Sequence, residues 1–437
     1  MRSTEQTAPT LVYALGEFPS VSETFILREM TALEAMGFRL LPLSMQPAPE
    51  GPVHAEAEGL AQRTLYRPRP FGAASWLGLL RTALQRPLGL CSAVVLVLRH
   101  MVVYPRAARE LVSALMAASY FASVSPRRWV RHVHCHFASY PTTVGLMLAE
   151  LCGTGLSFSC HARDILVEEP VLLPQKLREA DFVAVCTRTG LERLQRNHSL
   201  TSREKLRLIH HGLDWEPLSR LPRVQYPVPL ILAVGRLVEK KGFPFLLQAA
   251  AILAGRSLQF ELVVAGDGPQ RDELERLAGG LGLRERVVFA GALSQEELAH
   301  VYRRADVLCV PSIVAADGDR DGLPNVILEA MAYGVPVVGS NLPGIAEAVV
   351  SDETGLLVAP GSPTELAGAI ERIIGDSALR ERVTRNAREK VAREFDLRTN
   401  TAALARLFAQ CLGLRNWQPP GRPAETADSQ AGTIEFS

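Results

Sequence analysis

The sequence predicts an α/β protein built from two doubly wound parallel-sheet domains that face each other across a cleft. In each half of the chain, short apolar runs alternate with segments of helical period, which is the pattern of such domains. The chain has 437 residues, more than one ordinary hydrophobic core accommodates, so two or more domains are expected. Between the halves, the alternation stops at a cluster of prolines that is typical of a linker: Pro217, Pro222, Pro227 and Pro229.

The first half begins with a strand–helix–strand pattern and continues in the same way. Its apolar runs predict strands at residues 10–15, 39–43, 132–137, 156–160, 182–186 and 206–210. Helical periods predict a helix over residues 22–36, with Ser22 as its N-cap, and another over residues 142–152. Residues 46–68 lack a clear period and predict a loop, whereas residues 71–121 predict long apolar helices.

The second half repeats the alternation. Its strands are predicted at residues 230–234, 261–265, 287–290, 307–310 and 335–339, with helices between them and one long helix over about residues 377–412. The predicted organisation is an N-terminal domain, a linker, a C-terminal domain, a helical segment that packs back across the domains, and a disordered tail. Their bounds are 1–215, 216–229, 230–376, 377–413 and 414–437.

Composition excludes several classes of protein. The 47 basic and 46 acidic residues leave a formal net charge of +1, which argues against a nucleic-acid partner held by bulk charge. The seven cysteines show no metal-ligand spacing and favour a reducing compartment. The N-terminus lacks an apolar signal region, and the most apolar run, residues 88–98, is too short to span a bilayer. We therefore expect a cytoplasmic protein.

Two glycine-rich segments follow predicted strands of the second half. In AVGRLVEKKG, Gly235 lies at the carboxyl edge of a strand, where open α/β sheets bind ligands, and Arg236 and Lys241 are spaced to converge on one anion such as a diphosphate. In VVAGDGPQ, Gly266 and Gly268 precede a helix and leave room for a ligand to approach backbone N–H groups. Each segment alone is a weak indication of a phosphate site.

The third motif, DGDRDGLPNVILEAMAYGVPVVGS, combines carboxylates with the start of a helix. Asp321 precedes the predicted helix over residues 323–332, Gly322 leaves room for a ligand, and Glu329 lies within the helix among apolar residues. Carboxylates in these places can accept hydrogen bonds from the hydroxyls of a sugar and of a ribose.

GRLVEKKG, AGDGP, ADVLCVPS and DGLPNVILEAMAYGVPVV, in this order, resemble glycosyltransferase family 4, whose members are retaining enzymes of the GT-B fold. The resemblance covers about residues 205–400 and implies that Arg236 and Lys241 hold the donor diphosphate and that Glu329 binds the nucleotide ribose. Asp321 would contact the transferred sugar, but the family usually has Glu there, so its carboxylate is shifted by one methylene. The donor-binding residues that we expect are Gly235, Gly266, Gly268, Leu293, Gly322, Leu323 and Glu329.

FPSVSETFILREM and HCHFASYPTTVGLMLAE in the first half resemble a subgroup that builds bacterial exopolysaccharides, including colanic-acid-type transferases. In SFSCHARDI, His161 follows a strand at the point where the family often has a functional histidine near the donor sugar, although a lone histidine is more often structural. We expect Gly16, Ser22, His211 and Gly212 to line the acceptor side of the cleft. The residues expected to carry the chemistry are Arg236, Lys241, Asp321 and His161.

Two patterns resemble metal sites. Asp317, Asp319 and Asp321 imitate an EF-hand loop and a DxD motif, but Leu328 stands where the EF-hand needs Glu. The alternating histidines of HVHCH share one strand face, yet strand packing or contact with an acceptor explains them better than a metal does. We therefore expect no metal and no cofactor.

The predicted function is transfer of a sugar from a nucleotide-sugar donor to a saccharide or lipid-linked acceptor. The alternatives are a nucleotide-sugar epimerase of the same fold and, because of Asp321, an inactive scaffold subunit of a polysaccharide assembly complex. Five arginines punctuate the apolar helices of residues 71–121, which either cover the sheet or touch the inner face of the cell membrane as a peripheral surface: Arg81, Arg86, Arg99, Arg106 and Arg109.

Overall fold

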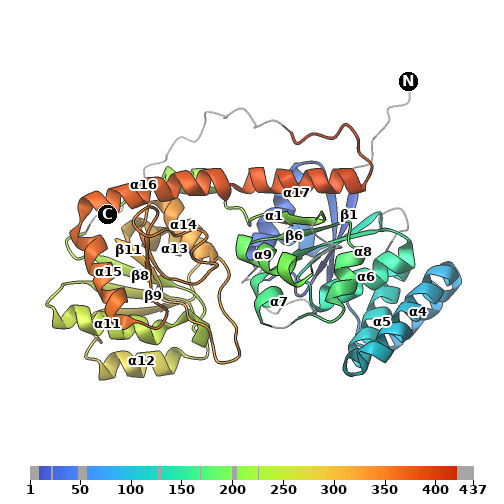
Figure 1. Cartoon of the computed structure of the whole chain (residues 1–437), viewed down its shortest axis with the longest axis horizontal. Helices are drawn as coiled ribbons and strands as arrows, with labels where there is room; N and C mark the ends of the chain where they lie inside the picture. Colours follow the sequence, from blue (N-terminus) through green and yellow to red (C-terminus); the bar gives the residue numbers. More distant parts are fainter. Residues whose placement is uncertain are drawn as a thin grey trace.

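The computed structural model describes residues 9–20, 23–47, 57–125, 130–167, 169–198, 204–224 and 226–420. Two parallel-sheet domains lie side by side, and two consecutive helices near the C-terminus run along both of them (Figure 1). Ser22 and residues 421–437 of the predicted tail lie outside the described residues. The predicted fold class is confirmed.

The sheet of the first domain has seven strands in the order β3-β2-β1-β4-β5-β6-β7, and all its pairings are parallel. The strands are β1 (Thr10–Leu15), β2 (Arg39–Ser44), β3 (Leu65–Tyr66), β4 (His132–His136), β5 (Gly155–Cys160), β6 (Phe182–Val185) and β7 (Leu206–Leu208). The loop predicted over residues 46–68 is wrong in part, because it contains the edge strand β3 and the helix α2 (Glu58–Ala61). Both are too short to show a period.

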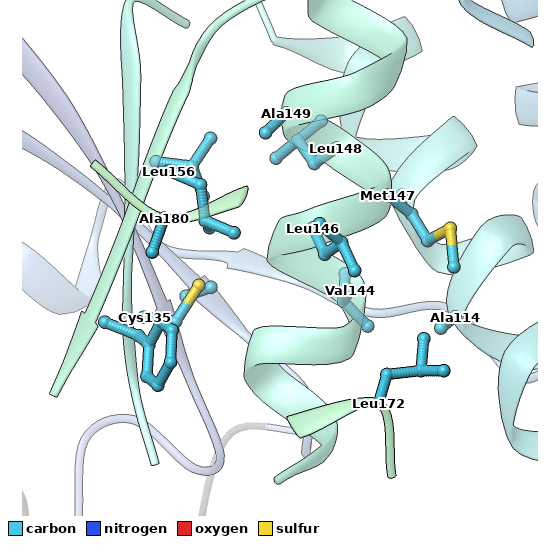
Figure 2. Packing of buried hydrophobic residues seen from close by; sticks show 14 of the residues in the cluster. Ala114, Cys135, Val144, Leu146, Met147, Leu148, Ala149, Leu156, Leu172 and Ala180 are labelled. Carbon is cyan, nitrogen blue, oxygen red and sulfur yellow. The ribbon is translucent and has the colours of Figure 1, made fainter. Parts of the chain in front are cut away.

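Helices cover both faces of this sheet. They are α1 (Thr24–Ala35), α3 (Ala73–Gln85), α4 (Pro87–Val103), α5 (Ala108–Val124), α6 (Tyr140–Cys152), α7 (Ala162–Leu166), α8 (Leu173–Glu179) and α9 (Arg188–Asn197). Figure 2 shows α6 with Leu146 and Leu148 among other buried apolar side chains, near Cys135 of β4. Gly145 lets α6 approach the sheet, because a Cβ there would lie 2.2 Å from Cys135 Sγ.

The second sheet has six strands in the order β10-β9-β8-β11-β12-β13. They are β8 (Leu230–Val234), β9 (Glu261–Ala265), β10 (Val287–Gly291), β11 (Val307–Val310), β12 (Val337–Ser340) and β13 (Leu356–Val358). The prediction missed β13, a three-residue edge strand. Strand order reverses beside β1 in the first sheet and beside β8 in the second, and such switch points are where doubly wound sheets bind ligands.

The helices of the second domain follow the usual crossover pattern. They are α10 (Trp215–Ser219), α11 (Phe243–Gly255), α12 (Arg271–Gly280), α13 (Gln295–Arg304), α14 (Asn325–Tyr333), α15 (Pro363–Gly375) and α16 (Ser377–Glu394). The proline-rich stretch predicted as a free linker is packed on this domain, because α10 contacts α14 and Arg223 donates to Gly334 O (2.8 Å).

The single long helix predicted over residues 377–412 is in fact two. Between α16 and α17 (Leu397–Cys411), Phe395 leaves the helical conformation and Asp396 caps α17 by accepting from Thr399 N (2.8 Å). α17 packs on α1 of the first domain. Beyond it, Trp417 lies 5.2 Å from Phe38 between ring centroids, so this part of the predicted disordered tail is packed.

The chain crosses between the domains twice, and the two crossings pair with each other. Leu213 N donates to Phe395 O (2.8 Å), and Leu397 N donates to Leu213 O (3.1 Å). A Cβ on Gly212 would lie 2.2 Å from Leu397 Cα. Gly212, predicted to line the cleft, therefore serves the close packing of the crossings instead.

Candidate active site

A pocket of about 310 Å³ lies between the two domains, beside the switch points of both sheets. The first domain lines it with residues that follow β4, β5, β6 and β7 and with the start of α1. The second domain lines it with Lys240 and with the segment of residues 319–325 that leads into α14. Ion pairs cross between the domains, for example from Arg163 Nη1 to Asp319 Oδ2 (3.5 Å).

Asp321 lines the second domain's side of the pocket, and Lys241 contacts it. Gly235 has a φ of 155° at the end of β8, and a Cβ there would lie 3.3 Å from Lys241 Cε, so the lysine side chain passes over this glycine. Lys241 Nζ donates to Asp321 Oδ2 (2.9 Å), which also accepts from Ser312 Oγ (2.6 Å). The structure therefore brings three predicted site residues together and adds Ser312, which the sequence analysis missed.

Arg236 stands apart from this cluster. Its side chain is exposed, and within the described ranges no ion pair joins it to another residue. An exposed guanidinium at the carboxyl end of β8 is available to an anion at the switch point. Its predicted convergence with Lys241 on one diphosphate stays a prediction.

Gly266 and Gly268 serve the close packing of two loops. A Cβ on Gly266 would lie 2.0 Å from Gly235 O, and one on Gly268 would lie 2.6 Å from Leu237 O. Their φ angles of 134° and 159° place the loop after β9 directly against the loop after β8. The missing side chains therefore let the two loops pack together, and the predicted approach of a ligand to backbone N–H groups there stays a prediction.

Glu329 joins the two domains. Its Oε1 accepts from Arg28 Nη2 of α1 (3.2 Å), and its Oε2 accepts from the buried Tyr302 OH (3.2 Å). Gly322 packs against the first domain as well, since a Cβ there would lie 2.9 Å from Ala162 Cβ. Leu323 lines the pocket.

The first domain lines the pocket with aromatic and imidazole rings. Phe137 follows β4 with a φ of 69°, a costly conformation for a residue with a side chain, and its ring lies 4.3 Å from that of His161. His161 N donates to Asp164 Oδ2 (3.1 Å) at the start of α7. The His211 ring is stacked on that of His161, with 5.0 Å between centroids, and Phe25 covers His211 at 4.1 Å.

Burial sets the protonation of this wall. It lowers the pKa of His211 to about 4, although the Glu29 charge opposes the shift, and it lowers the pKa of His161 well below the usual range. Burial also raises the pKa of Glu23, on the pocket wall, to about 7. The imidazoles are therefore neutral at pH 7 and able to accept as well as donate hydrogen bonds.

The patterns that resemble metal sites have other partners. His132 Nε2 and His134 Nδ1 both contact Ser157 Oγ (2.7 and 2.8 Å), and their rings pack against Phe408. Asp319 is paired with Lys240 Nζ (3.0 Å). Within the described part of the chain, three clusters bring metal-ligating atoms within 4.8 Å of one another: Glu29 with His134 and His136, His161 with Cys186 and His211, and His132 with Asp181 and Cys411.

The remaining predicted residues lie outside the pocket wall. Gly16 ends β1 at the switch point, with no atom within 4 Å of a Cβ built on it, so the space beside it is open. Leu293 lies half-buried in the loop between β10 and α13. Five residues at or beside the site were not predicted from the sequence, although two of them, Arg28 and Glu29, stand in the segment FILREM: Arg28, Glu29, Phe25, Phe137 and Lys240.

A family model of the glycosyl transferases group 1 matches residues 224–390, which include Lys241, Asp321 and Glu329. The protein is a glycosyltransferase with a group 1 domain. Over 409 residues this glycosyltransferase is 28% identical to a putative colanic acid biosynthesis glycosyltransferase, WcaL, of Escherichia coli K12, and the match covers 91% of the chain and 98% of that relative. Over 301 residues it is 28% identical to the alpha-D-kanosaminyltransferase of Streptomyces kanamyceticus, covering 64% and 76%.

Solved structures share the fold of the glycosyltransferase. Sucrose-phosphate synthase of Thermosynechococcus elongatus superposes with a TM-score of 0.67 at 22% identity, covering 93% of this chain and 100% of that one. Anabaena Alr3699/HepE in complex with UDP superposes with a TM-score of 0.65 at 17% identity, covering 92% and 100%. These likenesses confirm the predicted GT-B arrangement of two domains.

Proposed function

We propose that this glycosyltransferase moves a sugar from a nucleotide-sugar donor to a saccharide or lipid-linked acceptor with retention of configuration, in the synthesis of a bacterial exopolysaccharide or related surface glycan. The observation that carries the proposal is the pocket between the domains, which Asp321, His161 and His211 line, with Lys241 Nζ bonded to Asp321 Oδ2. The relative named for colanic acid biosynthesis supports the class of product, and the neighbour solved with UDP supports a nucleotide donor.

In the proposed reaction, the acceptor hydroxyl approaches the anomeric carbon on the face from which the nucleotide diphosphate leaves. The bond from this carbon to the diphosphate breaks, the bond to the acceptor oxygen forms, and a diphosphate oxygen takes the hydroxyl proton. Arg236 and Lys241 stabilise the charge that develops on the leaving group. Contacts between the domains, including Arg163 with Asp319, limit the access of water to the donor.

The test is a calorimetric screen of the full chain against nucleotide-sugars with different bases, followed by an assay of free nucleotide with and without saccharide acceptors. We expect one donor to bind and nucleotide to be released only when an acceptor is present. Conversion of the donor sugar to its epimer without any acceptor would overturn the proposal in favour of an epimerase. Donor or acceptor binding without turnover would instead identify a scaffold subunit.

We also propose that the surface formed by α3 and α4 binds an anionic membrane from its inner face. No acidic residue occurs between Phe71 and Arg109. The surface exposes large apolar side chains, with exposed fractions that reach 78% at Leu84, 85% at Leu88 and 84% at Val102. Arginines beside such residues suit anionic head groups. No helix within the described ranges is long and apolar enough to cross a bilayer.

Vesicle co-sedimentation at low and high salt tests this surface. We expect binding to vesicles of phosphatidylglycerol and phosphatidylcholine at low salt, and its loss when the exposed Arg81, Arg99 and Arg106 are changed to Glu. Arg86 is kept, because its Nε and Nη2 atoms are buried. The matched control changes three exposed arginines of the second domain to Glu: Arg276, Arg284 and Arg385. Wild-type protein that stays in the supernatant at low salt would contradict the proposal.

A further inference from the structure

Four side chains form a continuous line of hydrogen bonds from the interior of the first domain to the pocket. His136 Nε2 lies 3.0 Å from Glu29 Oε1, and His136 Nδ1 lies 3.3 Å from His161 Nε2. His161 Nδ1 then lies 3.2 Å from His211 Nε2. The line joins α1, the end of β4, the loop after β5 and the crossing between the domains. Both His161 and His211 line the pocket.

An ionised Glu29 together with a singly protonated His136 fixes the direction of every hydrogen bond in this line. An ionised carboxylate only accepts, so His136 Nε2 carries the proton that faces Glu29. When His136 carries this proton alone, its other nitrogen is an acceptor, so His161 Nε2–H donates to it. By the same reasoning His161 Nδ1 accepts from His211 Nε2–H. The line therefore leaves His211 Nδ1 with a free lone pair.

The surroundings of Glu29 keep it ionised although it is buried. Its side chain is 12% exposed and accepts a second hydrogen bond from Tyr13 OH (3.1 Å). Two donors, His136 Nε2 and Tyr13 OH, therefore converge on this carboxylate, and hydrogen bonds to the charged form favour ionisation. Within the described residues, no hydrogen-bond partner faces His211 Nδ1.

We propose that Glu29 and His136 are positioning residues that fix the tautomer of His161 and thereby make His211 Nδ1 an acceptor for a sugar hydroxyl in the pocket. This inference rests on the proposed function for the nature of the ligand. Both ring nitrogens of His161 are hydrogen-bonded within the line. His211, and not His161, therefore makes the direct contact with the sugar hydroxyl. The ring stack of His211 on His161 and the cover of Phe25 hold the accepting nitrogen in place.

The tautomers are measured directly by ¹⁵N NMR of the full chain with labelled histidines, with the His211 signals assigned through the His211→Gln variant. We expect the wild-type His211 to carry its proton on Nε2. His136→Phe breaks the line, so the fixed tautomer of His211 is lost. His136→Gln keeps it, because the amide donates to Glu29 and its oxygen accepts from His161. Glu29→Leu breaks the line from its other end, so the test does not depend on the folding of one variant.

The matched control is His134→Phe, two residues along the same strand face, which contacts Ser157 and Ser159 and is outside the line. It should leave the His211 tautomer unchanged even if stability falls. In kinetics, we expect His136→Phe to raise the KM of the sugar substrate about tenfold and His136→Gln to restore it within threefold. A wild-type His211 protonated on Nδ1, or the same His211 tautomer in His136→Phe, would overturn the inference. The NMR experiment contains no substrate. It therefore tests the tautomer of His211 even if the donor screen finds no nucleotide-sugar that binds.

Discussion

The second domain builds its wall of the pocket from the β8 loop and one segment before α14, whereas the first domain gathers its wall from the ends of several strands and one helix. In the second domain, Lys241 pairs with Asp321 at the switch point. In the first, imidazole and aromatic rings contact one another in sequence, and the carboxylate at the end of the line, Glu29, is not among the residues that line the pocket.

This difference separates two ways in which a side chain can serve one site. A charge on the second domain's wall acts directly on the leaving group, so its removal acts at once on turnover. A side chain in the hydrogen-bonded line from Glu29 to His211 acts through its neighbour. Its removal therefore first changes the tautomer or orientation of that neighbouring side chain. The predictions below are designed to test this contrast.

The largest effect is expected on the charged wall. Arg236→Ala and Lys241→Ala should each lower kcat by about a hundredfold, because a charge contact with the leaving diphosphate contributes roughly 3 kcal/mol to the transition state. Steady-state kinetics measures kcat for each variant, and thermal melting shows whether the variant is folded. Arg276→Ala, exposed on the same domain, is the control. Near-normal turnover of both variants in folded form would rule out the assigned roles.

The buried His132 of the first domain should make the protein sensitive to acid. Burial lowers the pKa of His132 to about 4, so the folded protein binds fewer protons than the unfolded chain between about pH 4 and 6.5. The free energy of unfolding therefore falls as the pH drops through this window, by about 2 kcal/mol at pH 5 for this one group. Urea unfolding at pH 7.5 and at pH 5 measures the free energy of unfolding at each pH. In His132→Gln, the fall between the two pH values should be smaller by about 2 kcal/mol. Equal pH dependence in the variant would show that His132 does not contribute.

A smaller effect is expected where the walls meet. If Glu329 binds the donor ribose, Glu329→Gln should weaken nucleotide binding about tenfold, in line with a hydrogen bond to a charged group. Arg28→Ala removes only the partner in the other domain, a partly exposed ion pair, and should change the affinity less than threefold. Calorimetry with the nucleotide identified by the donor screen compares the two. A larger loss in Arg28→Ala would assign Glu329 to domain contact instead.

The smallest effect is expected from removal of metals. Asp319 and Asp321 already have lysine partners, and the proposed mechanism draws its positive charge from Arg236 and Lys241. Activity after dialysis against excess EDTA should equal that of untreated enzyme. Loss of activity that manganese or magnesium alone restores would show that a metal takes part.

The two walls also differ in how far the sequence predicted them. Lys241, Asp321 and Gly322 stand in contiguous motifs next to strands with a strong apolar period, so both their places and their proximity were predictable. In the line from Glu29 to His211, successive hydrogen-bonded partners are 107, 25 and 50 positions apart in the sequence. Each of these residues, taken alone, resembles an isolated polar residue in a helix, strand or loop. The packing role of Gly266 was not predictable for a related reason: the backbone that packs against it comes from another loop.

Helix α17 belongs to the core of the domain that is made first. Leu404, Ala405 and Phe408 lie in the same apolar cluster as Tyr13 and Met30. A ribosome working at about 5–20 residues per second needs roughly 10–40 s between Leu208, the end of the first sheet, and Phe408. During that interval the face of the sheet that α17 will cover has no partner. The first domain to be synthesised is thus the last to be completed, and a nascent chain that stops before α17 presents this apolar face to chaperones.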